Sequence, residues 1–156
     1  MKVGKWTLAA ALVGFSLPAL ADVNDIASIR YAVSGAFNSP SAATSVSCTN
    51  ASSVTERFIV QVFDSSNGLP SQGGALNAVA SGNTVTFITQ AVQSFTASKV
   101  ILTTATTSIA QGWIAVYAST PYLFCTAMIV GVGSTTPDGM ALHMIRISPF
   151  PGAAAE

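Results

Sequence analysis

Two cysteines and one histidine are the most reactive side chains of this chain. Cys48 and Cys125 are far apart, in the apolar contexts SVSCTN and FCTAMIV, and each precedes a threonine. Two thiols and the single histidine, His143, supply too few ligands for a structural zinc site, and the spacing does not suit a dithiol redox motif. We therefore predict a Cys48–Cys125 disulfide, with two separate buried thiols as the alternative, and neither a metal nor a cofactor.

His143 is the only histidine available as a general base. A nucleophilic hydrolase needs a base beside its nucleophile and a third group that orients the base. His143 lies in the apolar stretch ALHMIRI, where a strand histidine satisfied by a neighbour is the simpler interpretation, and the chain has no Gly-x-Ser-x-Gly elbow. An unrecognised hydrolase site would have to bring His143 together with Asp138 or Glu56.

Carboxylate pairs and calcium ligands are the other chemistries to consider. A glycosidase pair would draw on Glu56, Asp64 and Asp138, but both aspartates lie in turn sequences, where Asp is favoured for backbone reasons. The segment DVNDIAS offers a weak set of calcium ligands in Asp22, Asn24 and Asp25. We assign no catalytic residue and predict that the protein is not an enzyme.

The N-terminus has the pattern of a secretory signal peptide. Lys2 and Lys5 precede the apolar run at 6–17, and small residues at Ala19 and Ala21 suit cleavage before Asp22. The alternative, a membrane anchor, would need about 20 apolar residues. We predict a signal peptide at 1–21, no transmembrane anchor and one domain at 22–156, exported to the periplasm or the cell exterior.

Low charge limits the kinds of partner that the exported chain can have. Residues 22–156 keep four basic against six acidic side chains, a net charge of −2, and only 8% of the whole chain is charged, against about 25% in typical domains. Four scattered cations cannot form the basic face that nucleic acids require. Weak mutual repulsion favours association, so the candidate partners are other copies of the chain or another envelope or extracellular protein, with an ordinary secreted monomer as the alternative.

The hydrophobic pattern has a period of two, which is typical of half-buried β-strands. It places Phe58, Val60 and Val62 on one face of a strand. In the first strand it places Ile29, Tyr31, Val33, Gly35 and Phe37 on one face. Turn sequences separate the runs: SGN predicts a hairpin, and residues 89–98 read as a short helix or a turn. We predict an all-β fold, a single antiparallel β-sandwich of seven to nine strands, immunoglobulin-like and Greek-key in broad architecture.

In such a sandwich the two cysteines could bridge the sheets across the core, as they do in immunoglobulin domains. The strand that ends in WIAVYA comes just before the strand of Cys125 and carries Trp113. Trp113 could pack near the bridge, but we expect it to be an ordinary core aromatic.

Four short motifs carry a resemblance. The order Cys-Thr-Asn at Cys48, Phe-Asp at Phe63, Phe-x-Thr at Phe87 and Cys-Thr-Ala at Cys125 resembles small exported bacterial β-sandwich proteins of uncharacterised function. It covers roughly residues 45–147. The resemblance implies a β-sandwich fold, export and a cysteine pair, and it transfers no catalytic residue.

Three functional hypotheses follow. The first is an exported, non-catalytic structural or interaction module associated with a surface, envelope or filament. The second is a sandwich that binds carbohydrate or another small ligand through exposed aromatic rings, for which the candidates are Tyr31, Tyr122 and Phe63. The third is the hydrolase with an unrecognised site.

Overall fold

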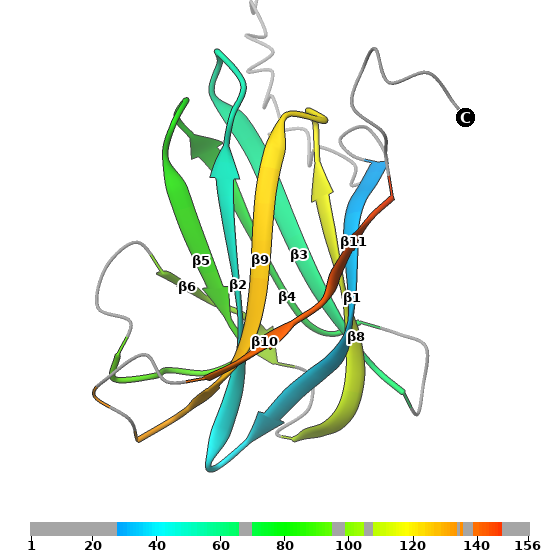
Figure 1. Ribbon diagram of the computed structural model, residues 1–156, viewed down its shortest axis with the longest axis vertical. Coiled ribbons are helices and arrows are strands. Elements are labelled where there is room, and N and C mark those ends of the chain that lie inside the picture. Colours follow the sequence, from blue (N-terminus) through cyan, green and yellow to red (C-terminus); the bar gives the residue numbers. More distant parts are fainter. Residues whose placement is uncertain are drawn as a thin grey trace, which may run out of the picture.

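The computed structural model describes residues 28–65, 70–94, 99–104, 108–133, 135 and 139–147. Within these ranges the regular elements are eleven β-strands, rich in the β-branched residues that suit a pleated surface (Figure 1). Their bounds are β1 (Ser28–Ser39), β2 (Ala42–Asn50), β3 (Glu56–Asp64), β4 (Pro70–Val79), β5 (Thr84–Ile88), β6 (Lys99–Ile101), β7 (Thr103–Thr104), β8 (Ile109–Ala118), β9 (Leu123–Gly131), β10 (Gly139–Leu142) and β11 (Met144–Arg146).

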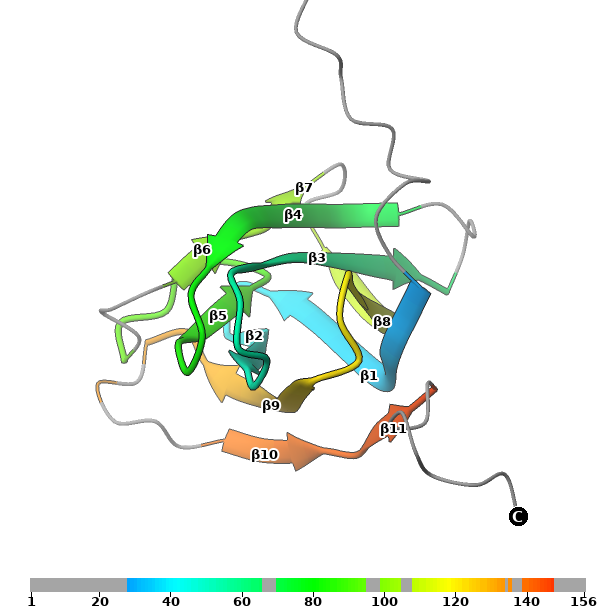
Figure 2. The ribbon, with the colours of Figure 1, turned by 90° about the horizontal axis from the view of Figure 1, so that it is seen from above.

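Hydrogen bonds join these strands into one open sheet that folds over into two layers (Figure 2). One layer has the order β10-β9-β2-β5-β6, and the other has the order β11-β1-β8-β3-β4-β7. The layers are continuous through the short β1–β2 pairing at the corner, and every pair is antiparallel except β5–β6. The predicted all-β antiparallel fold is therefore confirmed.

The strand count exceeds the expected seven to nine because two segments cross between the layers. β6 pairs with β5 and β7 pairs with β4, so the chain changes layer at Leu102. In the same way, β10 pairs with β9 and β11 with β1, which makes His143 the crossing point on the opposite side. Residues 139–147 lie at an exposed edge, and only one face of this segment packs against the core, through Leu142 and Met144.

The core fills the space between the layers. Inward side chains of both layers are fully buried, and the largest among them include Phe58, Phe87, Ile114 and Leu123. One polar side chain departs from this pattern: Gln72 is only 2% exposed, and neither its amide nitrogen nor its amide oxygen has a hydrogen-bond partner. Such a buried, unpaired amide lowers the stability of the fold.

Gly35 changes the face that the first strand presents to the core. Its φ of 85° lies in the left-handed region, and the pairing of β1 with β8 shifts register between Ser34 and Ala36. Ala36 is therefore buried, whereas Phe37 is only partly buried. The predicted alternation holds at Tyr31 and fails beyond this bulge.

The SGN turn is present, but it does not join a hairpin. Gly82 has a φ of 75°, as a tight turn requires. The strands on either side, β4 and β5, pair with different partners in opposite layers. The turn is therefore a corner that carries the chain from one layer to the other.

The described part of the segment predicted as a helix or turn, residues 89–94, is a turn without helix. It lies against the outside of the β9–β2 layer, where Val92 packs with Ala43 and Val130. The hydroxyl of Thr89 donates to the carbonyl of Phe37 at 3.1 Å. These contacts hold the segment against the corner between β1 and β2.

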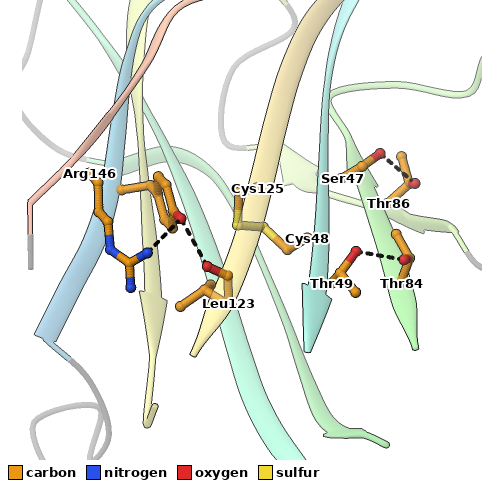
Figure 3. The surroundings of a disulfide bond; sticks show 9 residues. Ser47, Cys48, Thr49, Thr84, Thr86, Leu123, Cys125 and Arg146 are labelled. Carbon is orange, nitrogen blue, oxygen red and sulfur yellow. Dashed lines mark hydrogen bonds between the residues drawn. A yellow bond between two sulfur atoms is a disulfide. The ribbon is translucent and has the colours of Figure 1, made fainter. Parts of the chain in front are cut away.

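The predicted disulfide is confirmed, but its place in the fold is not the expected one. Cys48 on β2 lies directly opposite Cys125 on β9, with their Cα atoms 4.2 Å apart, so the bridge joins neighbouring strands of one layer (Figure 3). An immunoglobulin-like bridge across the core is therefore wrong. Sequence spacing could not reveal this, because strands distant in the chain can be neighbours in a sheet.

We predict that replacing both cysteines by alanine lowers the free energy of unfolding by about 4.5 kcal/mol. The bridge spans 77 residues of sequence, and the chain-entropy model assigns a loop of this length about that much stabilisation. Denaturant unfolding of the oxidised protein and of the Cys48→Ala/Cys125→Ala variant measures the difference. Wild-type protein kept reduced is the control and should match the variant; a loss below about 1 kcal/mol would contradict the prediction.

Candidate functional site: a loop platform at one end of the sandwich

Three connections meet at one end of the sandwich (Figure 1). They are the β2–β3 loop (51–55), the β4–β5 corner (80–83) and the β8–β9 loop (119–122), which we call the loop platform. The antiparallel register of β2 and β9 sets Asn50 opposite Leu123, so the loops that follow and precede these residues emerge side by side. Segments about 70 residues apart in sequence therefore share one surface.

The side chain of Asn50 organises the first of these loops. Asn50 is fully buried, and its Nδ2 donates to the carbonyls of Val54 at 2.7 Å and Val79 at 2.8 Å. Its Oδ1 accepts a hydrogen bond from the backbone N–H of Ser52 at 2.9 Å, which forms an Asx turn. One amide thus holds both ends of the β2–β3 loop and the end of β4.

Backbone hydrogen bonds join the other two loops to the same residues. The N–H of Asn50 donates to the carbonyl of Asn83 at 3.0 Å, and the N–H of Gly82 donates to the carbonyl of Asn50 at 2.8 Å. The N–H of Ala51 donates to the carbonyl of Tyr122 at 3.0 Å. All three loops are consequently bonded to Asn50 or its neighbour and form one unit.

Glu56 brings a carboxylate to this unit. It is the first residue of β3 and is partly buried. The single proton of the Ser52 hydroxyl is shared between the carbonyl of Val54 at 2.9 Å and one carboxylate oxygen of Glu56 at 3.3 Å. The other carboxylate oxygen accepts a hydrogen bond from the hydroxyl of Ser119. The carboxylate therefore links the β2–β3 loop to the β8–β9 loop.

A pocket of about 440 Å³ opens between these two loops. The Glu56 carboxylate and the buried side chain of Thr120 line it, together with residues of the β2–β3 loop. Val54 and Tyr122 also line it, and they are 59% and 43% exposed. The pocket is open to solvent and combines a few fixed polar groups with accessible apolar surface.

Side chains of β1 and β11 contact the β8–β9 loop and the first residue of β9. The phenol of Tyr31 donates to the carbonyl of Leu123 at 2.9 Å, and the guanidinium of Arg146 donates to the carbonyl of Pro121. Arg146 also lies over the Tyr31 ring, 5.6 Å from its centroid. Arg146 Nη1 also donates to the phenol oxygen of Tyr31 at 3.5 Å, so Figure 3 shows a chain of two hydrogen bonds from Arg146 through this hydroxyl to the carbonyl of Leu123.

The structure does not gather the groups that a hydrolase or glycosidase would need, as far as they are described. Glu56 and Asp64 occupy opposite ends of the nine-residue strand β3. His143 is exposed at the layer crossing, and the pocket that contains Glu56 does not include it. Asp138 lies outside the described residues, as do the signal-peptide region at 1–21 and the weak calcium ligands Asp22, Asn24 and Asp25.

The aromatic candidates lie in three different settings. Tyr31 is buried and hydrogen-bonded, so it is not a binding ring, whereas Tyr122 is exposed in the pocket. Phe63 is 8% exposed and stacks on Trp113, with ring centroids 4.1 Å apart. Trp113 lies on the outer face of its layer and is 39% exposed, so its prediction as a core aromatic is wrong. Further along β8, burial raises the pKa of the Tyr117 phenol.

One local signal in the sequence points to the platform, although the Cys-Thr-Asn motif yields a prediction only for its cysteine. An asparagine at the end of a strand, followed by the Ser-rich stretch ASSVT, is typical of an Asx turn. The convergence of Glu56 with Ser119 had no comparable signal, because it depends on the pairing of β2 with β9.

The environment and the comparisons complete the description of the site. The Cys48–Cys125 disulfide indicates a non-reducing, exported environment. Within the described ranges, no helix has the length and apolar character needed to cross a membrane, and no cluster of three or more ligating side chains could hold a metal ion. No family model, curated protein or solved structure matches the chain.

We predict that Asn50→Ala lowers the free energy of unfolding by about 3 kcal/mol, because it leaves buried carbonyls without donors. It should also accelerate amide hydrogen exchange across 51–55. Asn83→Ala is the matched control: Asn83 bonds to Asn50 through its backbone, so this change should shift the free energy by less than about 0.5 kcal/mol. Equal effects of the two substitutions would show that the Asn50 side chain does not organise the loops.

Proposed function

We propose that this protein is an exported, non-catalytic interaction module that recognises its ligand or partner through the loop platform. The observation that carries the proposal is the buried Asn50 amide, which, with the backbone of Asn50 and Ala51, ties three loops into one rigid surface around an open pocket. Rigid loops lose little conformational entropy on binding, so more of the contact energy appears as affinity.

Export to the periplasm or the cell exterior is part of the proposal. The disulfide supports it, since such bonds persist outside the reducing cytosol. The expected signal peptide at 1–21 points the same way, and it predicts a mature chain beginning at Asp22.

The non-catalytic assignment is supported by the placement of the candidate groups. Glu56 accepts a hydrogen bond from the hydroxyl of Ser119 and shares the proton of Ser52 with the carbonyl of Val54, and Asp64 lies at the far end of the same strand. His143 lies at the layer crossing rather than in the platform pocket. This arrangement resembles a recognition surface more than an acid–base pair.

We predict that the platform mediates binding to the cell envelope. Labelled mature protein should be retained on the isolated envelope of the cells that export it, and the double variant Val54→Ser/Tyr122→Ala should bind at least tenfold less. The reason is that these substitutions remove the accessible apolar surface of the pocket.

The matched control is Ile101→Ser, which removes a comparably exposed aliphatic residue on β6, outside this pocket. It should bind like the wild type. Equal retention of the double variant and the wild type would overturn the platform as the recognition surface. A mature N-terminus other than Asp22 would overturn the predicted cleavage site.

Self-association is a second candidate, favoured by the exposed edge at residues 139–147. Ile145 and Ile147 are 60% and 52% exposed, and Ile145 pairs with Ala32 on the outer face of its layer. Among the described strands, β11 pairs only with β1, so its other edge is open to a second copy of the chain. The low net charge reduces the repulsion between two copies.

We predict that sedimentation velocity detects a concentration-dependent dimer of the mature protein, and that Ile145→Lys abolishes it. A lysine at this position would place like charges opposite each other in a symmetric interface. Lys99→Ala is the control for a general effect of charge, and it should dimerise like the wild type. A monomer at the highest attainable concentration would exclude this candidate.

A further inference from the structure

The platform pocket has a charge that disfavours anionic ligands. Glu56 is the only charged residue among the described residues that line it. A phosphate or an acidic polymer would meet this carboxylate, and none of the described lining residues supplies a cation to compensate its charge. The ligand that suits the pocket is therefore neutral or positively charged.

The Glu56 carboxylate has unused hydrogen-bonding capacity. A carboxylate offers about four lone-pair sites on its two oxygens. The hydroxyls of Ser52 and Ser119 occupy one site on each oxygen, so each oxygen can accept one further hydrogen bond. Because the serines also fix its orientation, the carboxylate is prepared to accept two adjacent hydroxyl donors from a single ligand.

Apolar surface borders this polar centre. The ring of Tyr122 and the side chain of Val54 are both accessible at the pocket. The Tyr122 backbone is fixed on both sides, since its N–H donates to the hydroxyl of Thr120 at 3.0 Å and its carbonyl accepts from Ala51 at 3.0 Å. The ring is consequently presented from a fixed position, with a negative π face that attracts polarised C–H groups.

One class of neutral ligand combines both features. A pyranose carries vicinal hydroxyls on its rim and a face of polarised C–H groups. We infer that the platform pocket binds a neutral sugar residue, with the Glu56 carboxylate accepting two vicinal hydroxyls and the Tyr122 ring packing against the C–H face. This inference rests on the proposed function, because it names the ligand class of the same platform.

The test is a titration of the disulfide-intact mature protein with glucose, galactose, mannose and N-acetylglucosamine, followed by amide chemical shifts. At least one of these sugars should bind with a dissociation constant in the millimolar range, which is typical of a single sugar held by few contacts. The shift changes should be confined to 51–56 and 119–122. Binding of none of the four sugars, or shift changes elsewhere on the protein, would overturn the inference.

Three variants separate the two contacts. Glu56→Gln should weaken binding at least tenfold, because an amide presents one acceptor oxygen in place of two. Tyr122→Ala should abolish detectable binding, whereas Tyr122→Phe keeps the ring and should change affinity less than about twofold. Each variant is first shown to unfold cooperatively like the wild type. Equal affinity for wild type and Glu56→Gln would refute the carboxylate contact.

A cationic ligand is the competing outcome, and choline is its probe. Binding of choline without binding of any sugar would overturn the inference, since an ammonium group would then be the partner of Glu56 and Tyr122. The envelope experiment distinguishes a failure of the sugar assignment from a failure of the platform as the recognition surface. If no sugar binds but retention still depends on Val54 and Tyr122, the sugar assignment fails and the platform stands. If retention is independent of them, the platform itself fails.

Discussion

The buried amide of Asn50 is the interaction on which the loop end of the sandwich depends. A buried amide is stable only when its donors and acceptor are satisfied, and here the partners belong to the β2–β3 loop and to the end of β4. The backbone groups bonded to the amide depend on it equally, because without the Asn50 side chain they would lose their hydrogen-bond partners. The loops are therefore ordered by hydrogen bonds that water cannot easily replace, and the positions of Glu56 and Tyr122 follow from this order.

The position of Asn50 depends in turn on β2, the strand that connects the two layers. β2 pairs with β9 along its whole length, with β5 along its second half and with β1 at the corner. The disulfide fixes the pairing of β2 with β9 two residues before Asn50. The disulfide fixes the pairing of β2 with β9, this pairing positions Asn50, and the Asn50 amide holds the loops. Together these interactions bring loops from distant parts of the sequence to one surface.

Sequence reasoning recovered the features that depend on local alternation. Phe58, Val60 and Val62 are buried as predicted, and the two cysteines are bonded. Features that depend on which strands are neighbours were missed, since periodicity carries no information about pairing. The layer crossings at Leu102 and His143 and the bridge within one layer belong to this group. Gly35 was a further exception, because one positive φ shifts the alternation beyond it.

The same limit applies to the site. The sequence suggests Glu56 only as half of a carboxylate pair or as a partner of His143, and Tyr122 only as one exposed ring among three. Their shared pocket depends on the register that sets Asn50 opposite Leu123, and no spacing in the sequence encodes that register. The Asx turn at Asn50 was the one component that a local motif could have indicated.

Gln72 makes one margin of the sheet, where β4 pairs with β7, easier to open than the rest of the molecule. Its buried amide has no partner, and its strand is flanked at this point by the two-residue strand β7. Separation of β7 from β4 would break few hydrogen bonds and would let water reach the amide, which recovers part of the desolvation penalty. Opening should therefore begin at this margin of the sheet, away from the disulfide. The loop platform is far more resistant to opening. It would remain intact while the amide protons of the β4–β7 margin exchange with solvent.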